Sequence, residues 1–305
     1  MKILLIGYSN LARQKIIKTF IKKKITFCVA SKTAYKKIQG AYAQFKDYDE
    51  GLKKSGADLV YISLPNSLHY YWALKSLKAG FHVLVDKPIC EKKIELKKLI
   101  SCANKQKKLL AEAIFFNYHK QIKLAKIQIK NLNNLKKIHA NFTIPYPKKN
   151  SILVSRKLGG GVLMDMGPYA AALPRIFSNK KNISKKVIIT KSKSKLVTEF
   201  NLLCEYPKLT YSACFKFGGE YHNELFLHTD KKSIKLERVF SPPNDQILSL
   251  YIKKNGLIKI IKVKKDNSFE NFFTEVLNKI KNKDFFYYVI QMQNDMNFRD
   301  KVLNT

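Results

Sequence analysis

Short apolar runs alternate with amphipathic stretches along the first third of the chain. The apolar runs have the length of strands buried on both faces, and the stretches between them repeat apolar residues at helical spacing. Strands that alternate with helices in this way form parallel sheets. We expect strands at Lys2–Ile6, Ile25–Ala30, Leu59–Leu64, His82–Val85 and Leu109–Phe115, and helices at Leu11–Ile21, Ser67–Lys78 and Glu91–Gln106.

In the second half of the chain, apolar and polar residues alternate with a period of two. Strands with one solvated face produce this pattern, and short polar turns such as Lys254-Asn255-Gly256 connect antiparallel neighbours. The expected helices of this half are Gly167–Phe177, Phe269–Lys281 and Phe285–Leu303. The expected strands are Lys137–Pro145, Val187–Lys191, Val197–Tyr206, Thr210–Phe217, Glu224–Thr229, Ser233–Arg238, Gln246–Lys253 and Leu257–Val263.

The composition fits a protein with two cores. A chain of 305 residues with 46% hydrophobic residues has enough length and apolar content for two domains. No apolar run reaches the ~18 residues that a membrane helix needs. The first apolar run stops at Gly7 without a small-residue cleavage site, so we expect no signal peptide and a cytoplasmic location.

The net charge of +36 widens the set of possible partners. Nucleic acid is one candidate. The excess of positive charge, however, is almost entirely lysine, whereas bidentate hydrogen bonds to phosphate and guanine are made mainly by arginine. The lysines are spread over nearly every segment, as a lysine-rich composition alone would produce. We therefore expect no specific nucleic-acid partner, although the positive field attracts anionic substrates. The arginines are Arg13, Arg156, Arg175, Arg238 and Arg299.

The cysteines exclude two further classes of site. Their number is odd, they are scattered, and no CxxC pair occurs, which is atypical of a disulfide framework or a zinc site. We expect them to be small apolar residues in a reducing compartment, and we expect no metal site.

A glycine-led turn follows the first expected strand. The segment Gly7–Ala12 reads GYSNLA, which matches the dinucleotide fingerprint at its first glycine and its small third position, with Ser9 in place of the second glycine. A structural turn in a nucleotide-free α/β domain would look similar. The position between strand and helix favours a pyrophosphate site, with Gly7, Ser9, Asn10 and Leu11 as its contacts.

The end of the second strand bears on the kind of dinucleotide. An NAD site usually has Asp or Glu there, which binds the ribose 2′-hydroxyl. This chain has Ser31 and Lys32 instead, and its next carboxylate is Asp47. Hydroxyl and ammonium groups suit a 2′-phosphate, so we expect NADP(H) to be preferred over NAD(H). The alternative is that Lys32 is one solvated lysine among many.

The fold class that we predict is therefore α/β, with two domains. Residues 1–116 form an N-terminal Rossmann dinucleotide-binding domain. Residues 117–305 form an α+β domain with a large, mostly antiparallel sheet, which binds substrate and mediates oligomerisation. Ligands of such open sheets bind at the carboxyl ends of the strands. The residues expected to contact the cofactor there are Gly7, Ser9, Asn10, Leu11, Ser31, Lys32, Leu64, Pro65, Asn66, His69, Asp86 and Lys87.

Three segments resemble one known family. Ala79–Pro88 reads AGFHVLVDKP, Glu112–His119 reads EAIFFNYH, and Gly159–Tyr169 reads GGGVLMDMGPY. They are similar to AGxHVLxEKP, EAxxxRxHP and GGGxxxDxGxY of the glucose–fructose oxidoreductase, inositol dehydrogenase and rhizopine-catabolism (Gfo/Idh/MocA) oxidoreductases, with Asp86 for the usual Glu. The resemblance covers residues 1 to 178 most clearly.

The resemblance implies a nicotinamide-dependent oxidoreductase. It places Lys87, Asp165 and Tyr169 at the family's catalytic positions and leaves His119 as either a substrate contact or a satisfied core histidine. Hydride transfer to a carbonyl builds negative charge on oxygen, which needs a proton donor and a cation. Tyr169 fits the donor, Lys87 the cation, and Asp165 would orient substrate hydroxyls. The alternative for Asp165 is a helix N-cap.

Other stretches, such as Ser9–Arg13, Ser63–His69 and Glu237–Pro243, resemble a narrower branch of reductases that act on nucleotide-linked keto-sugars. We therefore expect reduction of a nucleotide-linked keto-sugar in surface-glycan biosynthesis. Two alternatives stay open: a dehydrogenase of a free sugar or polyol, and a non-catalytic dinucleotide-binding regulator. Because a half-solvated sheet is usually covered, we also expect a homodimer or homotetramer.

Overall fold

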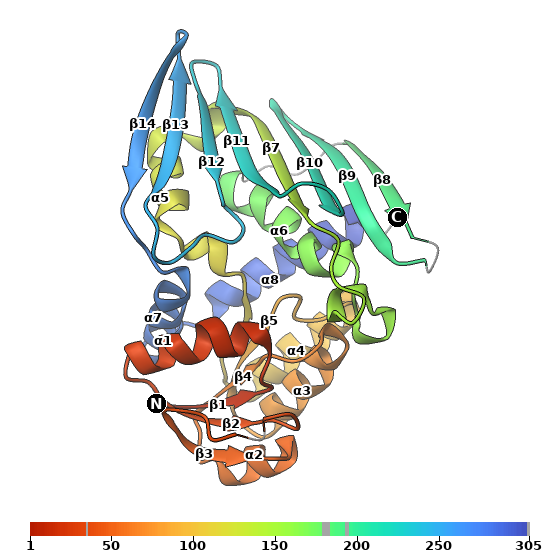
Figure 1. The fold of residues 1–305 in the computed structure, drawn as a ribbon, viewed down its shortest axis with the longest axis vertical. Helices are drawn as coiled ribbons and strands as arrows, with labels where there is room; N and C mark the ends of the chain where they lie inside the picture. The colour runs from red at the N-terminus through yellow and green to blue at the C-terminus, as the bar shows by residue number, and fades with distance from the viewer. Residues whose placement is uncertain (35, 179–183, 193–194, 304–305) are drawn as a thin grey trace. The chain divides into compact units, whose positions relative to one another are not determined.

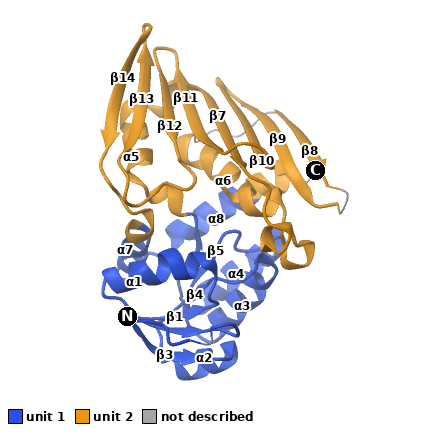
Figure 2. Cartoon of the chain, viewed as in Figure 1, with its two compact units in different colours: residues 1–114, 272–296 blue, residues 115–271, 297–305 orange. Residues whose placement is uncertain are grey.

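The computed structural model describes residues 1–34, 36–178, 184–192 and 195–303. It divides into two compact units, the first made of Met1–Ile114 with Phe272–Met296 and the second of Phe115–Asn271 with Asn297–Thr305 (Figure 2). The expected division after residue 116 differs from these units in two respects. Phe115 and Phe116 belong to the second unit. Residues 272–296, which the sequence analysis placed in the second domain, pack with the first unit.

The first unit contains a six-stranded parallel sheet in the order β3-β2-β1-β4-β5-β6. From β1, the chain adds β2 and β3 on one side of the sheet. It then returns to the other side of β1 and adds β4, β5 and β6, so the direction of strand addition reverses between β1 and β4. Such a switch point is where doubly wound sheets bind ligands. Its strands are β1 (Lys2–Ile6), β2 (Thr26–Ala30), β3 (Ala41–Phe45), β4 (Leu59–Ile62), β5 (His82–Asp86) and β6 (Leu110–Ala113).

Most helices of this unit lie where the pattern predicts. A π-helical turn at Ala12–Ile16 continues into α1 (Ile17–Lys22), and α3 (Asn66–Lys78) and α4 (Lys93–Lys105) follow β4 and β5 (Figure 1). Two elements, β3 and α2 (Tyr48–Lys54), were not predicted. β3 is an edge strand of partly and fully exposed residues, so its apolar pattern is weak. α2 begins at an Asp47 cap that accepts hydrogen bonds from Asp49 and Glu50.

Aromatic packing places the late helices with this unit. Phe273 on α7 (Ser268–Lys281) lies edge-on to Phe20 at 4.9 Å and to Tyr61 at 5.7 Å between ring centroids. Phe285, just before α8 (Phe286–Phe298), contacts His82. Apolar periodicity shows that a helix face is buried but not against which element, so the packing of these helices with the first unit was not predicted.

The second unit contains an eight-stranded sheet in the order β14-β13-β12-β11-β7-β10-β9-β8. All neighbours pair antiparallel except β7 and β10, which run parallel. The expected large, mostly antiparallel sheet is thereby confirmed. Its strands are β7 (Leu135–Ile144), β8 (Ser184–Lys191), β9 (Val197–Tyr206), β10 (Leu209–Phe217), β11 (His222–Thr229), β12 (Ser233–Glu237), β13 (Leu248–Lys254) and β14 (Leu257–Val263).

One face of this sheet carries the core of the unit. Along β10, buried residues alternate with partly exposed ones without interruption, and α6 (Val162–Phe177) packs on β9 and β10 (Figure 1). α6 starts at Val162, five residues before the predicted Gly167, because Gly161 and not a polar side chain forms its N-cap. α5 (Lys120–Ile129) was missed altogether, and the expected helix 285–303 ends in a separate π-helical segment, Arg299–Leu303.

Candidate functional site

The turn after β1 requires glycine. Gly7 has a φ of +97°, and a Cβ there would lie 2.2 Å from the carbonyl oxygen of Ser63 on the neighbouring β4 segment. Two residues later, the Ser9 hydroxyl accepts a hydrogen bond from the Ala12 N–H at 3.0 Å and contacts the Ser63 hydroxyl at 2.7 Å. Ser9 therefore fixes the turn to both its own helix and the adjacent strand.

This turn leaves backbone donors available. Within the described residues, no hydrogen bond occupies the N–H groups of Ser9, Asn10 and Leu11. They lie at the N-terminal end of a helix, where orphan N–H groups and the helix dipole favour an anion. Ser9, Asn10 and Leu11 are at least partly exposed. The residues present thus fit a dinucleotide pyrophosphate.

At the end of β2, the two expected cofactor residues have different surroundings. Ser31 is buried, and its hydroxyl accepts hydrogen bonds from the N–H groups of Thr33 and Ala34, both at 3.2 Å. Lys32 is exposed, with its ammonium 5.3 Å from the ring centroid of Tyr48. Ser31 therefore shapes the turn, while Lys32 presents a positive charge to solvent.

A chain of hydroxyl groups connects the ends of β1, β4 and β5. The Ser63 hydroxyl donates to Asp86 at 2.6 Å, and the Tyr61 hydroxyl donates to the other carboxylate oxygen. Burial raises the pKa of Asp86, and burial together with the Asp86 charge raises the pKa of Tyr61. Asp86 is thus held in one orientation directly before Lys87. Tyr61 and Ser63 were not predicted as part of the site; the signal that could have indicated them is two hydroxyl residues in an otherwise apolar segment.

His69 connects two of these strand ends. It is fully buried on α3, with Nδ1 2.7 Å from the Pro88 carbonyl oxygen and Nε2 2.8 Å from the Leu64 carbonyl oxygen. Burial lowers the pKa of His69. Each ring nitrogen lies within hydrogen-bond distance of a backbone carbonyl oxygen, so the imidazole holds the segments after β4 and β5 together, and its contact with a cofactor stays a prediction. Around it, Leu64 is buried, Pro65 and Lys87 are partly exposed, and Asn66 is the first residue of α3.

In the second unit, Asp165 and Tyr169 lie on one helix. Both belong to α6, four residues apart, which places them on the same face. Asp165 lies in the first turn and donates its N–H to the Gly161 carbonyl oxygen at 3.0 Å. Gly161 is the residue that caps the helix, so the alternative of Asp165 as the N-cap is wrong. Both side chains are partly exposed.

An aromatic cluster surrounds the Tyr169 ring. Phe240 stacks on it at 5.5 Å with an interplanar angle of 30°, and Phe116 lies edge-on at 5.6 Å. Phe142 contacts both Tyr169 and Phe240. The ring is therefore clamped on several sides, which fixes the direction of its hydroxyl. This cluster was not predicted from the sequence, since its members come from separate strands and loops.

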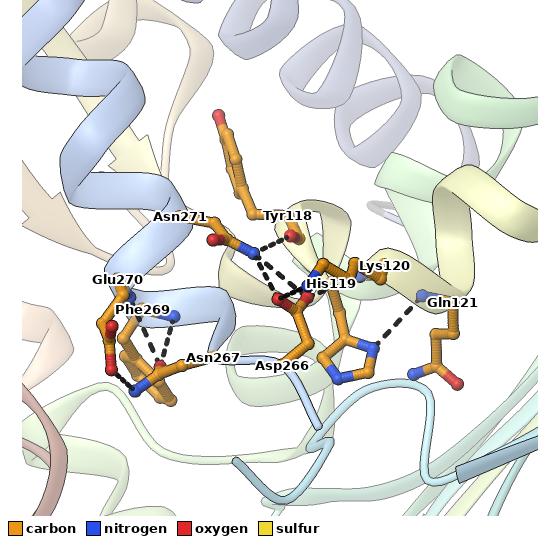
Figure 3. Close-up of polar contacts among 9 residues, drawn as sticks. All are labelled: Tyr118, His119, Lys120, Gln121, Asp266, Asn267, Phe269, Glu270 and Asn271. Carbon is orange, nitrogen blue, oxygen red and sulfur yellow. Dashed lines mark hydrogen bonds and ion pairs between the residues drawn. The ribbon is translucent and has the colours of Figure 1, made fainter. Parts of the chain in front are cut away.

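His119 caps α5 from a buried position. Its Nδ1 accepts a hydrogen bond from the Gln121 N–H at 3.3 Å, and within the described residues Nε2 has no hydrogen-bond partner. Next to it, the buried Asp266 accepts from the Lys120 N–H at 2.7 Å and from the Asn271 amide at 3.0 Å (Figure 3). Burial lowers the pKa of His119. The structure thus gives His119 a helix-capping contact, and a contact with substrate stays a prediction.

The predicted site residues fall into two groups. Those of the cofactor set lie in the first unit, at the ends of adjacent strands, and Lys87 is among them. Asp165, Tyr169 and His119 lie in the second unit. The joint action of Lys87 with Asp165 and Tyr169 therefore stays a prediction. In the described residues, no group of three or more His, Cys, Asp or Glu side chains is placed to hold a metal ion.

The first unit has the sheet order, glycine turn and helix N-terminus of a dinucleotide-binding oxidoreductase domain. Residues 1–114 match the model of the Gfo/Idh/MocA proteins, described as an oxidoreductase family with an NAD-binding Rossmann fold. This match confirms, over these residues, the resemblance and the Rossmann fold expected from the sequence.

Beyond this domain, the chain is similar to several enzymes that act on sugars. A dTDP-3,4-didehydro-2,6-dideoxy-alpha-D-glucose 3-reductase of Streptomyces violaceoruber is 27% identical over 248 residues, which are 78% of this chain and 72% of the relative. A D-xylose 1-dehydrogenase (NADP+) of Haloferax volcanii is 29% identical over 45% of this chain and 43% of its own length. The structure of a 3-ketoreductase from Actinomadura kijaniata, in complex with NADP and TDP-benzene, has a TM-score of 0.92, with 20% identity, 100% of this chain covered and 97% of that chain. At that identity, the likeness establishes a shared fold over the whole chain.

Among the described residues, no helix has both the length and the apolar character needed to cross a membrane.

Proposed function

We propose that this protein is an NADPH-dependent reductase of a carbonyl group on a nucleotide-linked keto-sugar, acting in the biosynthesis of surface glycans. The observation that carries the proposal is the clamped Tyr169 with Asp165 one turn before it on α6. A hydroxyl held in one direction suits proton donation, and a carboxylate on the same face of the helix suits hydrogen bonds with the hydroxyls of a sugar. The dTDP-keto-sugar 3-reductases among the relatives support the substrate class.

The first unit would hold the cofactor. The N–H groups of Ser9, Asn10 and Leu11 would bind the pyrophosphate, and Lys32 would bind the 2′-phosphate of NADPH. When bound, the nicotinamide supplies a hydride to the substrate carbonyl. Asp86, fixed by Tyr61 and Ser63, orients the segment that carries Lys87.

Each proposed catalytic residue has one task during reduction. Negative charge develops on the carbonyl oxygen as the hydride arrives. Lys87 stabilises that charge, and Tyr169 transfers its hydroxyl proton to the oxygen, so that an alcohol forms and the tyrosinate is reprotonated from solvent. Asp165 accepts hydrogen bonds from sugar hydroxyls and orients the ring.

The test combines cofactor binding with turnover. Wild-type protein should bind NADPH more tightly than NADH in a nicotinamide-fluorescence titration, and Lys32→Ala should weaken NADPH binding about 10- to 100-fold. Tyr169→Phe keeps the ring stacked and removes only the hydroxyl. It should lower kcat for a dTDP-linked 3-keto-sugar about 100- to 10,000-fold with cofactor affinity unchanged. Equal turnover by Tyr169→Phe and wild type would contradict the assignment of the proton donor.

One other enzymatic function has support from a relative. The D-xylose 1-dehydrogenase among the relatives favours a free sugar as an alternative substrate. Oxidation of free aldoses with NADP+, together with no activity on nucleotide-linked keto-sugars, would establish this alternative. A non-catalytic regulator would instead bind the dinucleotide and turn over neither substrate.

The outward face of the eight-stranded sheet would mediate self-association into a homodimer or homotetramer. Cross-strand pairs place Tyr251 beside Ile260, and Phe226 beside both Lys235 and His139, in a row across this face. Ile260 and Leu203 are exposed there. A mixed apolar and polar surface of this width is typical of subunit interfaces. A cytoplasmic location and the lack of a specific nucleic-acid partner stay predictions.

A further inference from the structure

An exposed arginine lies over a tyrosine ring in the second unit. The guanidinium carbon of Arg238 is 5.2 Å from the ring centroid of Tyr221. Arg238 has a φ of +54°, which a non-glycine residue adopts only when its surroundings hold it there, and its N–H donates to the Asn223 carbonyl oxygen at 2.7 Å. The backbone therefore presents this side chain at a defined position.

A buried asparagine organises the same place. The Asn223 side-chain amide donates to the hydroxyls of Tyr221 and Ser241, each at 2.9 Å. Its amide oxygen accepts from the Phe240 N–H at 2.9 Å. One buried residue thus fixes the orientation of the tyrosine and the course of the segment that follows Arg238. Such a network makes the arginine–tyrosine pair a rigid platform.

This platform lies close to the proposed proton donor. The Phe142 ring centroid lies 6.4 Å from that of Tyr221 and 5.9 Å from that of Tyr169. Phe240, two residues after Arg238, stacks directly on Tyr169. Tyr221 and Tyr169 therefore contact the same aromatic ring, which places the arginine–tyrosine pair in the aromatic cluster of the proposed proton donor.

The charge on the platform is not neutralised by the protein. Within the described residues, Arg238 forms no ion pair, and the preceding Glu237 pairs with Lys235 at 2.9 Å. Arginine is also rare in this lysine-rich chain, with five in all. Its planar fork binds two phosphate oxygens at once while it stacks on an aromatic ring, which the point charge of lysine does not do.

We propose that Arg238, supported by Tyr221, binds the diphosphate of the nucleotide-linked substrate while the sugar reaches Tyr169. This inference rests on the proposed reductase function and adds to it the residue that selects a nucleoside diphosphate over a free sugar. Arg238 is a substrate-binding residue and takes no part in the transfer of hydride or proton.

The test uses dTDP as the probe, titrated calorimetrically into the full-length protein saturated with NADPH. Wild type should bind dTDP, and Arg238→Met should weaken binding about 10- to 100-fold. Arg238→Lys should bind dTDP more tightly than Arg238→Met but more weakly than wild type, because lysine keeps the positive charge and lacks the bidentate guanidinium. Lys279→Met is the matched control: it removes a cation 4.7 Å from the Tyr287 ring in the first unit and should bind dTDP like wild type.

The controls separate this inference from the proposed function. All variants should keep the wild-type affinity for NADPH and the wild-type circular dichroism, and Arg238→Met should raise KM for the nucleotide-linked substrate with little change in kcat. If Arg238→Met binds dTDP as wild type does, the inference is overturned and the reductase function stands. The same follows if wild type reduces keto-sugars without binding dTDP. If wild type binds neither NADPH nor dTDP, both proposals fail.

Discussion

At the turn after β1, a single missing Cβ decides whether two strands can meet. Gly7 combines a left-handed φ with a carbonyl oxygen at 2.2 Å from the place where a Cβ would be. Gly80 also has a positive φ, of +84°, but has nothing within 4 Å of its Cβ position. A substitution at Gly80 therefore measures the free-energy cost of the backbone conformation alone, and a substitution at Gly7 adds the cost of steric overlap.

We expect Gly7→Ala to lower the free energy of unfolding by about 4 kcal/mol or more, because the backbone at Ser63, directly after β4, must move. Gly80→Ala should cost about 1 kcal/mol, since it bears only the conformational penalty. Urea unfolding followed by circular dichroism measures both. Similar costs for the two variants would mean that the strand ends are less tightly packed at Gly7 than the structure indicates.

At the scale of elements, His69 ties the end of β4 to the segment after β5. Its two ring nitrogens lie against the carbonyl oxygens of Leu64 and Pro88, which belong to the segments after β4 and β5. α3 thus positions two loops at once through one side chain.

Ser76 lies on the same helix and offers a comparison with His69. It is also fully buried, but its hydroxyl has no hydrogen-bond partner among the described residues.

We therefore predict that His69→Ala lowers the free energy of unfolding by about 3 kcal/mol, since it removes both contacts and leaves a cavity. It should also weaken NADPH binding, because Leu64 and Lys87 lose their support. Ser76→Ala is the control and should change neither quantity appreciably. A His69→Ala protein with normal NADPH affinity would show that the loops are positioned without the imidazole.

At the scale of the whole molecule, the eight-stranded sheet has one face that covers the core and one that stays partly exposed. The exposed row includes Phe226, whose ring lies 5.6 Å from the Lys235 ammonium. A large sheet with aromatic and aliphatic groups on its outer face gains stability when a second copy covers it. The net charge of +36 opposes this association at low ionic strength.

Sedimentation equilibrium at moderate salt should show the wild-type protein as an oligomer of the 35.3 kDa chain. Phe226→Glu should shift it to the monomer, because a charge is then buried at the centre of the interface. Ile94→Glu, at a residue that is 56% exposed on α4, should leave the mass unchanged. A monomeric wild type would contradict self-association through this sheet.

Local patterns in the sequence determined most of the secondary structure and the class of the first domain. Buried parallel strands are continuous apolar runs, and half-solvated strands alternate, so both sheets could be predicted. The glycine turn and the segments around Lys87, Asp165 and Tyr169 are contiguous motifs, which a sequence displays directly. Elements with weak patterns were missed, such as the exposed edge strand β3 and the helix α5.

Only the tertiary structure decided which distant residues meet. The Tyr61 and Ser63 hydroxyls on Asp86, the imidazole between Leu64 and Pro88, and the Asn223 network beneath Arg238 each join residues from different strands or loops. The physical reason is that periodicity reports whether a side chain is buried, while strand order and register determine what it is buried against. The sequence therefore indicated the chemistry of the protein, and the fold determined the contacts that orient it.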